Sequence, residues 1–464
     1  MRRQHSASFV TLSEWQIDST PTSTKMHSVI DHNAAYSLCI LWFALLLILY
    51  FDARTKPSSG LTLIYAAQLS ILHLPGGMLL LVPWYEYYPR AWTFLGFQLT
   101  GFGLLAFVAG VLFARFALPK LQIEPKLANP SAAKRLGAVL IATGIGFTFL
   151  ISQANFLFQI PSVSAVLSGI WLLGAPGLCI YMHAFILNGE KMPAHVYLIA
   201  LGFPVLSVIL LGFLGFGITY VIFIICFGIS QKYFPKLLIA LAPALVYVGL
   251  SFFVNYLAER DDIRAAVWGE KSLSVRTDAA FAIFTDFEWF DKDDFFHLKA
   301  LDDRLNQNWL VGAAAESLEF GHTEFLEGES LTFALVAWVP RAIWTNKPSV
   351  AGSGAIAASL TGLTFAEGTS IGVGHILELY GNFGDASLYI GMFLIGFILR
   401  AIDLRASEYL AGNNLIMWVR WVIPGIALTN VGGQLAETVS GVAAFIILGH
   451  LLQFAIMRLS RGFD

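Results

Sequence analysis

AAYSLCILWFALLLILYF, at residues 34–51, contains no charged side chain and is long enough to cross a bilayer as a helix. Comparable apolar runs recur along the chain, several of them short or interrupted by Gly and Pro. This pattern predicts an all-α polytopic membrane protein with about eleven transmembrane helices. We expect the spans at residues 34–51, 61–82, 91–116, 135–152, 163–187, 194–213, 216–231, 237–256, 386–402, 414–430 and 438–457.

The composition points to the same class of protein. Hydrophobic residues make up 57% of the chain and charged residues 13%, too few to cover a soluble protein of this length. The cysteines lie in separate apolar runs, so their spacing predicts neither a disulfide framework nor a metal cluster. An isoelectric point near 6.4 and the lack of a basic domain predict no nucleic-acid partner.

Basic residues predict the orientation, because cytoplasmic loops are enriched in Lys and Arg. The segment 115–135 is basic, the segment 153–162 carries no charge, and Arg400 and Arg405 mark a later cytoplasmic loop. The C-terminus is therefore expected in the cytoplasm and the long segment 257–385 outside. The expected organisation is a bundle of about eight helices at 34–256, one large outer loop at 257–385 and three helices at 386–464.

Residues 1–33 form a Ser- and Thr-rich tail without the apolar core of a signal peptide. Its basic residues Arg2, Arg3 and Lys25 fit an outward location poorly. Two interpretations remain open: translation starts at Met26, or the tail is short and disordered.

The outer loop differs in charge from the rest of the chain. Segment 257–385 has a net charge of −11, whereas the remainder has a net charge of +8. Helical patterns are expected at 278–299 and 303–319, and the apolar stretch 331–344 is too short to span, which predicts a re-entrant or interfacial helix.

Within this loop, Trp338 to Pro348 places two cations among indoles and prolines. Arg341 and Lys347 flank Trp344 and are the only basic residues of the loop after Arg304. Guanidinium and ammonium groups at a lipid boundary are suited to binding a lipid-linked pyrophosphate. Interfacial anchoring by the same cations and Trp is the alternative.

A second cluster follows at the point where the chain returns to the membrane. If 372–382 is helical, His375, Glu378 and Asn382 share one face. An imidazole, a carboxylate and an amide together could deprotonate a sugar hydroxyl and hydrogen-bond its neighbours. The alternative is a simple helix end, with Ser370 as N-cap, Gly381 and Gly384 as terminators, and His375 facing water.

Other polar groups are less specific. Arg304 to Trp309 combines a cation, amides and an indole, which is typical of sugar-binding surfaces or of a solvated helix start. Arg260 and Arg264 could meet phosphate or pair with Asp261 and Asp262, and we favour the pairing. The acidic run at 291–294 has the spacing of a nucleotide-sugar metal site, but nucleotide sugars are absent outside the membrane.

The stretch from Pro340 through Arg341, Trp344 and Lys347 to Pro348 resembles the signature of bacterial oligosaccharide repeat-unit polymerases, the O-antigen (Wzy-type) polymerases. Thr369 and Ser370, and the run from Glu378 through Tyr380, Asn382 and Phe383 to Gly384, resemble the same family, as does the GMxxxG pattern at Gly391–Gly396. The resemblance covers roughly residues 300–400. Two departures are Thr345-Asn346, where the family often has Pro-Asp, and the uncharged segment 212–217, where it often has Ser-Arg.

The resemblance implies a GT-C-like fold in the bacterial inner membrane, with the large loop in the periplasm. It also implies a metal-independent glycosyltransferase without cofactors, whose substrates are oligosaccharides linked to undecaprenyl pyrophosphate. In this interpretation Arg341 and Lys347 bind the diphosphate with help from Arg304, and Glu378 or His375 is the catalytic base. The sugar contacts are Tyr380, Asn382, Trp344 and Ser370. Membrane lipids and a chain-length regulator protein are the implied partners, and the product is O-antigen or exopolysaccharide.

Two other functions remain open. An O-antigen ligase would transfer a finished glycan from the same lipid carrier to a lipid A core. A transporter of lipid-linked glycans would need polar groups at the membrane midplane and paired broken helices, and neither is evident in the sequence.

Overall fold

The computed structural model describes residues 32–119, 123–152, 170–233, 241–269, 271–285, 287–339, 343–344, 346–347, 352–365 and 371–461. All regular elements within these ranges are helices. Eight are long and apolar enough to cross a membrane, which confirms a polytopic membrane protein. They are α1 (His32–Thr55), α2 (Leu61–Leu79), α3 (Arg90–Ala117), α4 (Pro130–Ser152), α7 (Ala194–Leu211), α10 (Ala242–Trp268), α17 (Asp385–Ala411) and α19 (Leu435–Arg461).

Three further apolar helices are shorter than a full span: α6 (Gly174–Leu187), α8 (Leu214–Ser230) and α18 (Leu415–Leu428). They coincide with three of the predicted spans. The predicted number of about eleven crossings stays a prediction, because length and composition alone qualify eight helices.

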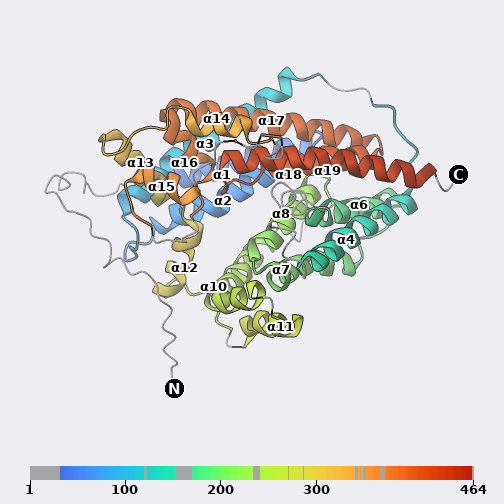
Figure 1. The fold of residues 1–464 in the computed structure, drawn as a ribbon, viewed down its shortest axis with the longest axis horizontal. Coiled ribbons are helices and arrows are strands. Elements are labelled where there is room, and N and C mark those ends of the chain that lie inside the picture. Colours follow the sequence, from blue (N-terminus) through green and yellow to red (C-terminus); the bar gives the residue numbers. More distant parts are fainter. Residues whose placement is uncertain are drawn as a thin grey trace.

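The spanning helices and the three shorter apolar helices form two packed groups (Figure 1). One contains α1, α2, α3, α17, α18 and α19, and the other contains α4, α6, α7, α8 and α10. Contacts of α8 with α2 and of α6 with α18 join the groups. Successive helices run in alternating directions, so the α7–α8 and α18–α19 turns lie at one end of the bundle, which we call the loop face.

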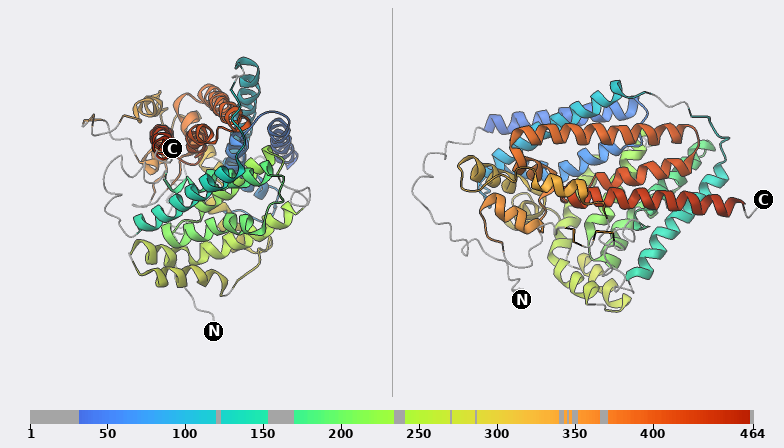
Figure 2. Two further views of the ribbon diagram at one scale, coloured as in Figure 1. Left: turned by 90° about the vertical axis from the view of Figure 1, so that its right-hand side faces the viewer. Right: turned by 45° about the horizontal axis from the view of Figure 1, so that its top comes forward.

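The short helices within residues 308–383 lie at the loop face, where α17 begins, whereas the helix at 273–281 packs against α7 and α10 (Figure 2). Of the predicted helices there, 303–319 corresponds to α13, whereas 278–299 is divided because Asp294 caps a new helix through the N–H groups of Phe296 and His297. The short elements are α11 (Leu273–Phe281), η4 (Ala282–Phe284), α12 (Phe295–Leu305), α13 (Asn308–Glu319), α14 (Glu329–Val336), α15 (Ser353–Thr361) and α16 (Gly374–Phe383).

Helix α10 extends to Trp268, well beyond its predicted end at residue 256. The extension carries an apolar face, since Ile263 and Val267 are buried in a cluster with Val208 and Leu214. The outer segment therefore begins at the end of a helix that is packed against the α7–α8 turn.

Arg400 corrects one element of the predicted topology. It is not a loop residue: its guanidinium is fully buried in α17, 2.8 Å from the carboxylate of Asp403 and 3.0 Å from that of Asp52. Asp403 also accepts hydrogen bonds from Ser59 N and from Ser58 Oγ, at the start of α2. The buried charges are thus paired and join α1, α2 and α17 at the end opposite the loop face.

Helix α3 makes two close glycine crossings. A Cβ at Gly110 would lie 2.0 Å from Phe393 O of α17, and a Cβ at Gly396 of α17 would lie 2.2 Å from Phe107 O of α3. Gly96 and Gly312 form the same reciprocal contact between α3 and α13, with distances of 1.9 Å to Asn308 O and to Trp92 O. Small residues of this kind let helix backbones approach within a membrane.

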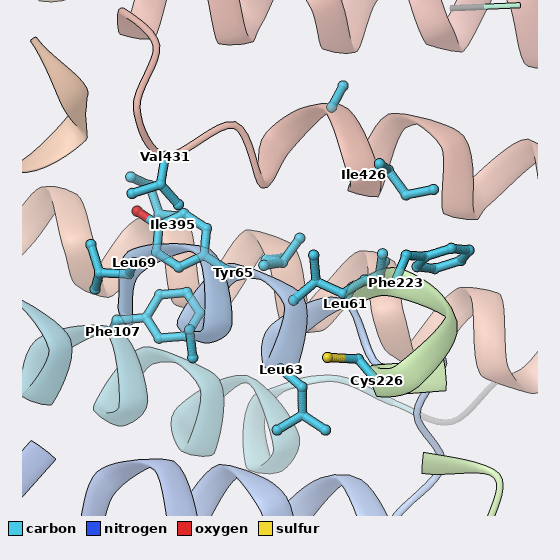
Figure 3. Packing of buried hydrophobic residues seen from close by; sticks show 14 of the residues in the cluster. Leu61, Leu63, Tyr65, Leu69, Phe107, Phe223, Cys226, Ile395, Ile426 and Val431 are labelled. Atoms are coloured by element: carbon cyan, nitrogen blue, oxygen red, sulfur yellow. The ribbon is translucent and has the colours of Figure 1, made fainter. Parts of the chain in front are cut away.

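Between these crossings the core is filled by large side chains. Tyr65 of α2 stacks on Phe107 of α3 with ring centroids 4.5 Å apart, and Leu69 and Ile395 lie beside the pair (Figure 3). Such interdigitated packing supplies the dispersion contacts that hold helices together where lipid removes the hydrophobic driving force.

We predict that Gly110→Ala lowers the free energy of unfolding by about 1–3 kcal/mol, because the new methyl group overlaps a backbone oxygen of α17. Gly146→Ala in α4 is the matched control, since nothing lies within 4 Å of a Cβ there. Thermal unfolding of both variants in detergent measures the difference. Equal effects of the two substitutions would contradict the tight crossing.

Candidate functional site

Helix α16 carries the predicted polar cluster, and its N-cap position is occupied by Val373. The predicted alternative of an N-cap at Ser370 is wrong for this helix. Gly384, with a φ of 63°, ends the helix as expected, whereas Gly381, the other predicted terminator, lies inside it. His375, Glu378 and Asn382 are all buried in α16, so the shared face points into the protein.

His375 is enclosed. Its Nδ1 lies 3.1 Å from the Tyr65 hydroxyl of α2, and its Nε2 lies 3.1 Å from the Thr438 hydroxyl of α19. Burial lowers the pKa of His375 to about 4, so the ring is neutral at physiological pH. These contacts are those of a residue that joins three helices, and they leave no ring nitrogen open to a substrate.

Glu378 is only 1% exposed, and its Oε2 accepts a hydrogen bond of 2.7 Å from Leu435 N in the first turn of α19. Desolvation raises the pKa of Glu378 to about 7, and the nearby charge of Glu437 acts in the same direction. A pKa near neutrality suits a catalytic base, but the carboxylate serves here as a cap of α19.

The predicted sugar contacts Asn382 and Tyr380 have protein partners. The Asn382 side chain accepts from Gly328 N and donates to Ser330 Oγ, which holds the start of α14 against α16. The Tyr380 hydroxyl donates to Glu319 Oε1 at 3.2 Å, at the end of α13. Both residues therefore connect the short helices of the loop face.

Lys347 lies at the end of α14. Its Nζ donates hydrogen bonds to the carbonyl oxygens of Ala337 at 2.7 Å and Val339 at 3.0 Å, the positions that a basic side chain takes when it caps a helix. Trp344 is exposed. Arg341 and Ser370 lie outside the described residues, so the predicted pairing of Arg341 with Lys347 stays a prediction.

Arg304 belongs to a group of three arginines that the sequence did not reveal, here called the arginine cluster. Arg304, in the last turn of α12, lies within electrostatic range of Arg260 and Arg264 of α10. None of the three forms an ion pair within 4.0 Å in the described part of the chain, and the predicted pairing of Arg260 and Arg264 with aspartates is absent there. Asp261 is near enough to attract both α10 arginines without contacting them.

Arg264 lies beside the uncharged α7–α8 turn. Its guanidinium lies 4.7 Å above the Phe213 ring, and its Nε is buried without a hydrogen-bond partner. A lone buried donor of this kind is costly unless a ligand satisfies it. The structure thus brings a cation to the α7–α8 turn from a helix distant in sequence.

Next to this turn, a cavity of about 340 Å³ lies between the two helix groups. Its volume is within the range of small-molecule binding sites. Apolar and aromatic side chains from α4, α7, α8, α18 and α19 form much of the wall, and hydroxyl, amide and carboxylate groups gather near the α18–α19 turn. The lining residues are Gln68, Thr148, Trp171, Leu172, Leu211, Phe216, Thr219, Tyr220, Ile426, Ala427, Thr429, Asn430, Glu437, Thr438, Gly441 and Phe445.

The cavity lies between the polar groups described above. Phe216 of its wall packs against Phe213, the ring beneath Arg264, with centroids 5.5 Å apart. On another wall, Thr438 holds His375 through its hydroxyl. Arg264, through Phe213, and His375, through Thr438, therefore each lie directly behind the lining of this cavity.

Sequence reasoning missed Glu437, which is exposed in this cavity. It precedes the predicted last span and follows a turn rich in Gly, Asn and Gln at 430–434. An acidic residue directly before an apolar run, at a helix N-terminus, is a signal that could have drawn attention to it.

Comparisons of the chain with protein-family models, with curated proteins and with solved structures find no match.

We predict that Glu378→Gln stabilises the protein at high pH. The folded-state pKa of about 7 lies above the usual value of 4.5, so native Glu378 contributes stability that is present below pH 4.5 and lost as pH rises through 7. Gln keeps the acceptor for Leu435 N without this loss, which amounts to about 3 kcal/mol by pH 8. Thermal unfolding of both proteins from pH 4.5 to 8.5 measures the difference.

The exposed Glu324→Gln variant is the control and should follow the wild type throughout this range. A Glu378→Gln effect that is independent of pH would show that Glu378 is already ionised in the native protein.

Proposed function

We propose that this protein is a glycosyltransferase that uses oligosaccharides linked to a polyprenyl diphosphate, and that it joins them into a polysaccharide. In this proposal the loop face is periplasmic and the membrane is the bacterial inner membrane. The resemblance of residues 300–400 to oligosaccharide repeat-unit polymerases supports the reaction class.

The observation that carries the proposal is the arginine cluster beside an apolar cavity. A polyprenyl diphosphate has a strongly anionic head and an apolar tail, and the site offers cations and an unpartnered guanidinium Nε next to a largely apolar wall. Three arginines that form no ion pair in the described part of the chain repel one another, and a bound diphosphate would relieve that repulsion.

The same cations would serve the chemistry. Transfer breaks the bond between the anomeric carbon and the diphosphate oxygen, and negative charge develops on the leaving diphosphate. Guanidinium groups that already surround this position stabilise that charge without reorganisation. In this scheme Arg304 keeps its predicted role, Arg260 and Arg264 join it, and Arg341 and Lys347 remain candidates for a second contact.

A ligase is the second candidate, because the same observations describe a site for the lipid-linked donor and leave the acceptor open. Reconstituted protein supplied only with lipid-linked oligosaccharide distinguishes the two. A polymerase forms longer glycans from this substrate alone, whereas a ligase forms product only when lipid A core is added.

We expect Arg264→Gln and Arg304→Gln each to reduce polymer formation at least tenfold and to weaken binding of undecaprenyl diphosphate, because each removes a charge-assisted contact worth about 1.5–3 kcal/mol. Reconstituted protein in nanodiscs allows both measurements. Lys292→Gln is the matched control, since Lys292 is an exposed loop cation paired with Asp293. Unchanged binding in both arginine variants would remove the cluster from the donor site.

We also predict that Arg341→Ala abolishes long polymer without impairing membrane insertion, because the resemblance assigns Arg341 to the diphosphate. Glycan length on gels and the amount of protein in membranes give the two readouts. Persistence of long-chain glycan would refute the role of Arg341 and leave that of the arginine cluster intact.

A further inference from the structure

The cavity contains one carboxylate in its described lining, that of Glu437. Glu437 lies in the first turn of α19, is exposed, and has neither an ion pair nor a hydrogen bond within the described part of the chain. Its carboxylate is therefore available to a molecule in the cavity.

The geometry around Glu437 is open because Gly433 has no side chain. A Cβ at Gly433 would lie 3.3 Å from Glu437 Oε2 and 2.5 Å from Asn430 Nδ2. Asn430 also lines the cavity. The carboxylate thus stands beside an amide donor, and the pair could bind a sugar hydroxyl from two sides.

The other nearby carboxylates are occupied. Glu378 caps α19 and is 1% exposed, and Glu319 accepts from Tyr380. Glu316 accepts from the indole of Trp92. None of these three lines the cavity.

Glu437 and Arg264 lie on different sides of the cavity. Glu437 belongs to the wall of α18 and α19, whereas Arg264 of the arginine cluster lies behind the wall of α7 and α8, beneath Phe213 and Phe216. In a direct displacement at an anomeric carbon, the base and the leaving group act on different faces of the sugar ring. A donor sugar in the cavity would have the carboxylate on one side and the guanidinium behind the other.

We propose that Glu437 is the catalytic base of this site. Its carboxylate accepts the proton of the acceptor hydroxyl while that oxygen forms the new bond to the anomeric carbon. The bond from the anomeric carbon to the diphosphate oxygen breaks, and its electron pair leaves with the diphosphate. The inference rests on the proposed function and replaces Glu378 and His375 in the role of base.

The test compares Glu437→Gln with the wild type in nanodiscs that contain undecaprenyl-diphosphate-linked oligosaccharide. We expect kcat to fall about 10²- to 10⁴-fold, the range for loss of a general base, while binding of undecaprenyl diphosphate changes less than about twofold. Glu437→Asp should recover part of the rate.

Controls separate the possible failures. Glu324→Gln should retain full activity, and an unchanged melting temperature of Glu437→Gln would show that the variant is folded. If the wild-type protein forms product and Glu437→Gln is equally active, the role of Glu437 is wrong and the proposed function is unaffected. The same conclusion follows if Glu378→Gln lowers kcat and Glu437→Gln does not. Wild-type protein that neither binds undecaprenyl diphosphate nor forms product would overturn the proposed function and this inference together.

Discussion

The reciprocal glycine crossings of α3 are the constraint on which the rest of this structure depends. Gly110 and Gly396 bring α3 and α17 into backbone contact, and Gly96 and Gly312 do the same for α3 and α13. A membrane interior provides little hydrophobic force between helices, so close backbone approach and the dispersion contacts around it must supply the attraction. Helix α3 therefore packs closely against both the spanning helix α17 and the short helix α13, which lies between α10 and α17 in the chain.

That second crossing explains why the outer segment is not a separate domain. Asn308, the first residue of α13, hydrogen-bonds with the ring of His73 in α2, and Gln307 N donates to Leu72 O. Gly312, about one turn after Asn308 in α13, lies against the backbone of α3. Helix α13 also contacts α16, and α12 packs against α2, so Arg304 and Glu378 are carried by helices that rest on the bundle. The site therefore depends on contacts made inside the bundle.

The electrostatics of the loop face follow from this arrangement. At the opposite end of the bundle, buried Arg400 is neutralised by Asp52 and Asp403, as a charge in an apolar interior must be. Within the described residues the arginine cluster forms no ion pair within 4.0 Å, although the segment between α10 and α17 is rich in acidic residues. The buried charges at the opposite end are paired and hold helices together, whereas in the described part of the chain the arginines of the loop face lie outside any ion pair.

Sequence reasoning determined the class of the protein, the positions of most spanning helices and the helical nature of 374–383, because apolar length and periodicity are local properties of the chain. It also pointed to Arg304. It could not reveal that His375 and Asn382 face inward, that Arg400 is buried, or that Lys347 caps α14, because each depends on partners far away in the chain.

Tertiary structure alone decided the composition of the site. Arg264 reaches the α7–α8 turn from α10, Arg304 lies in the last turn of α12, and Glu437 enters the cavity from α19. Residues so widely separated carry no shared local pattern. Their proximity arises from backbone packing, which a single sequence does not display.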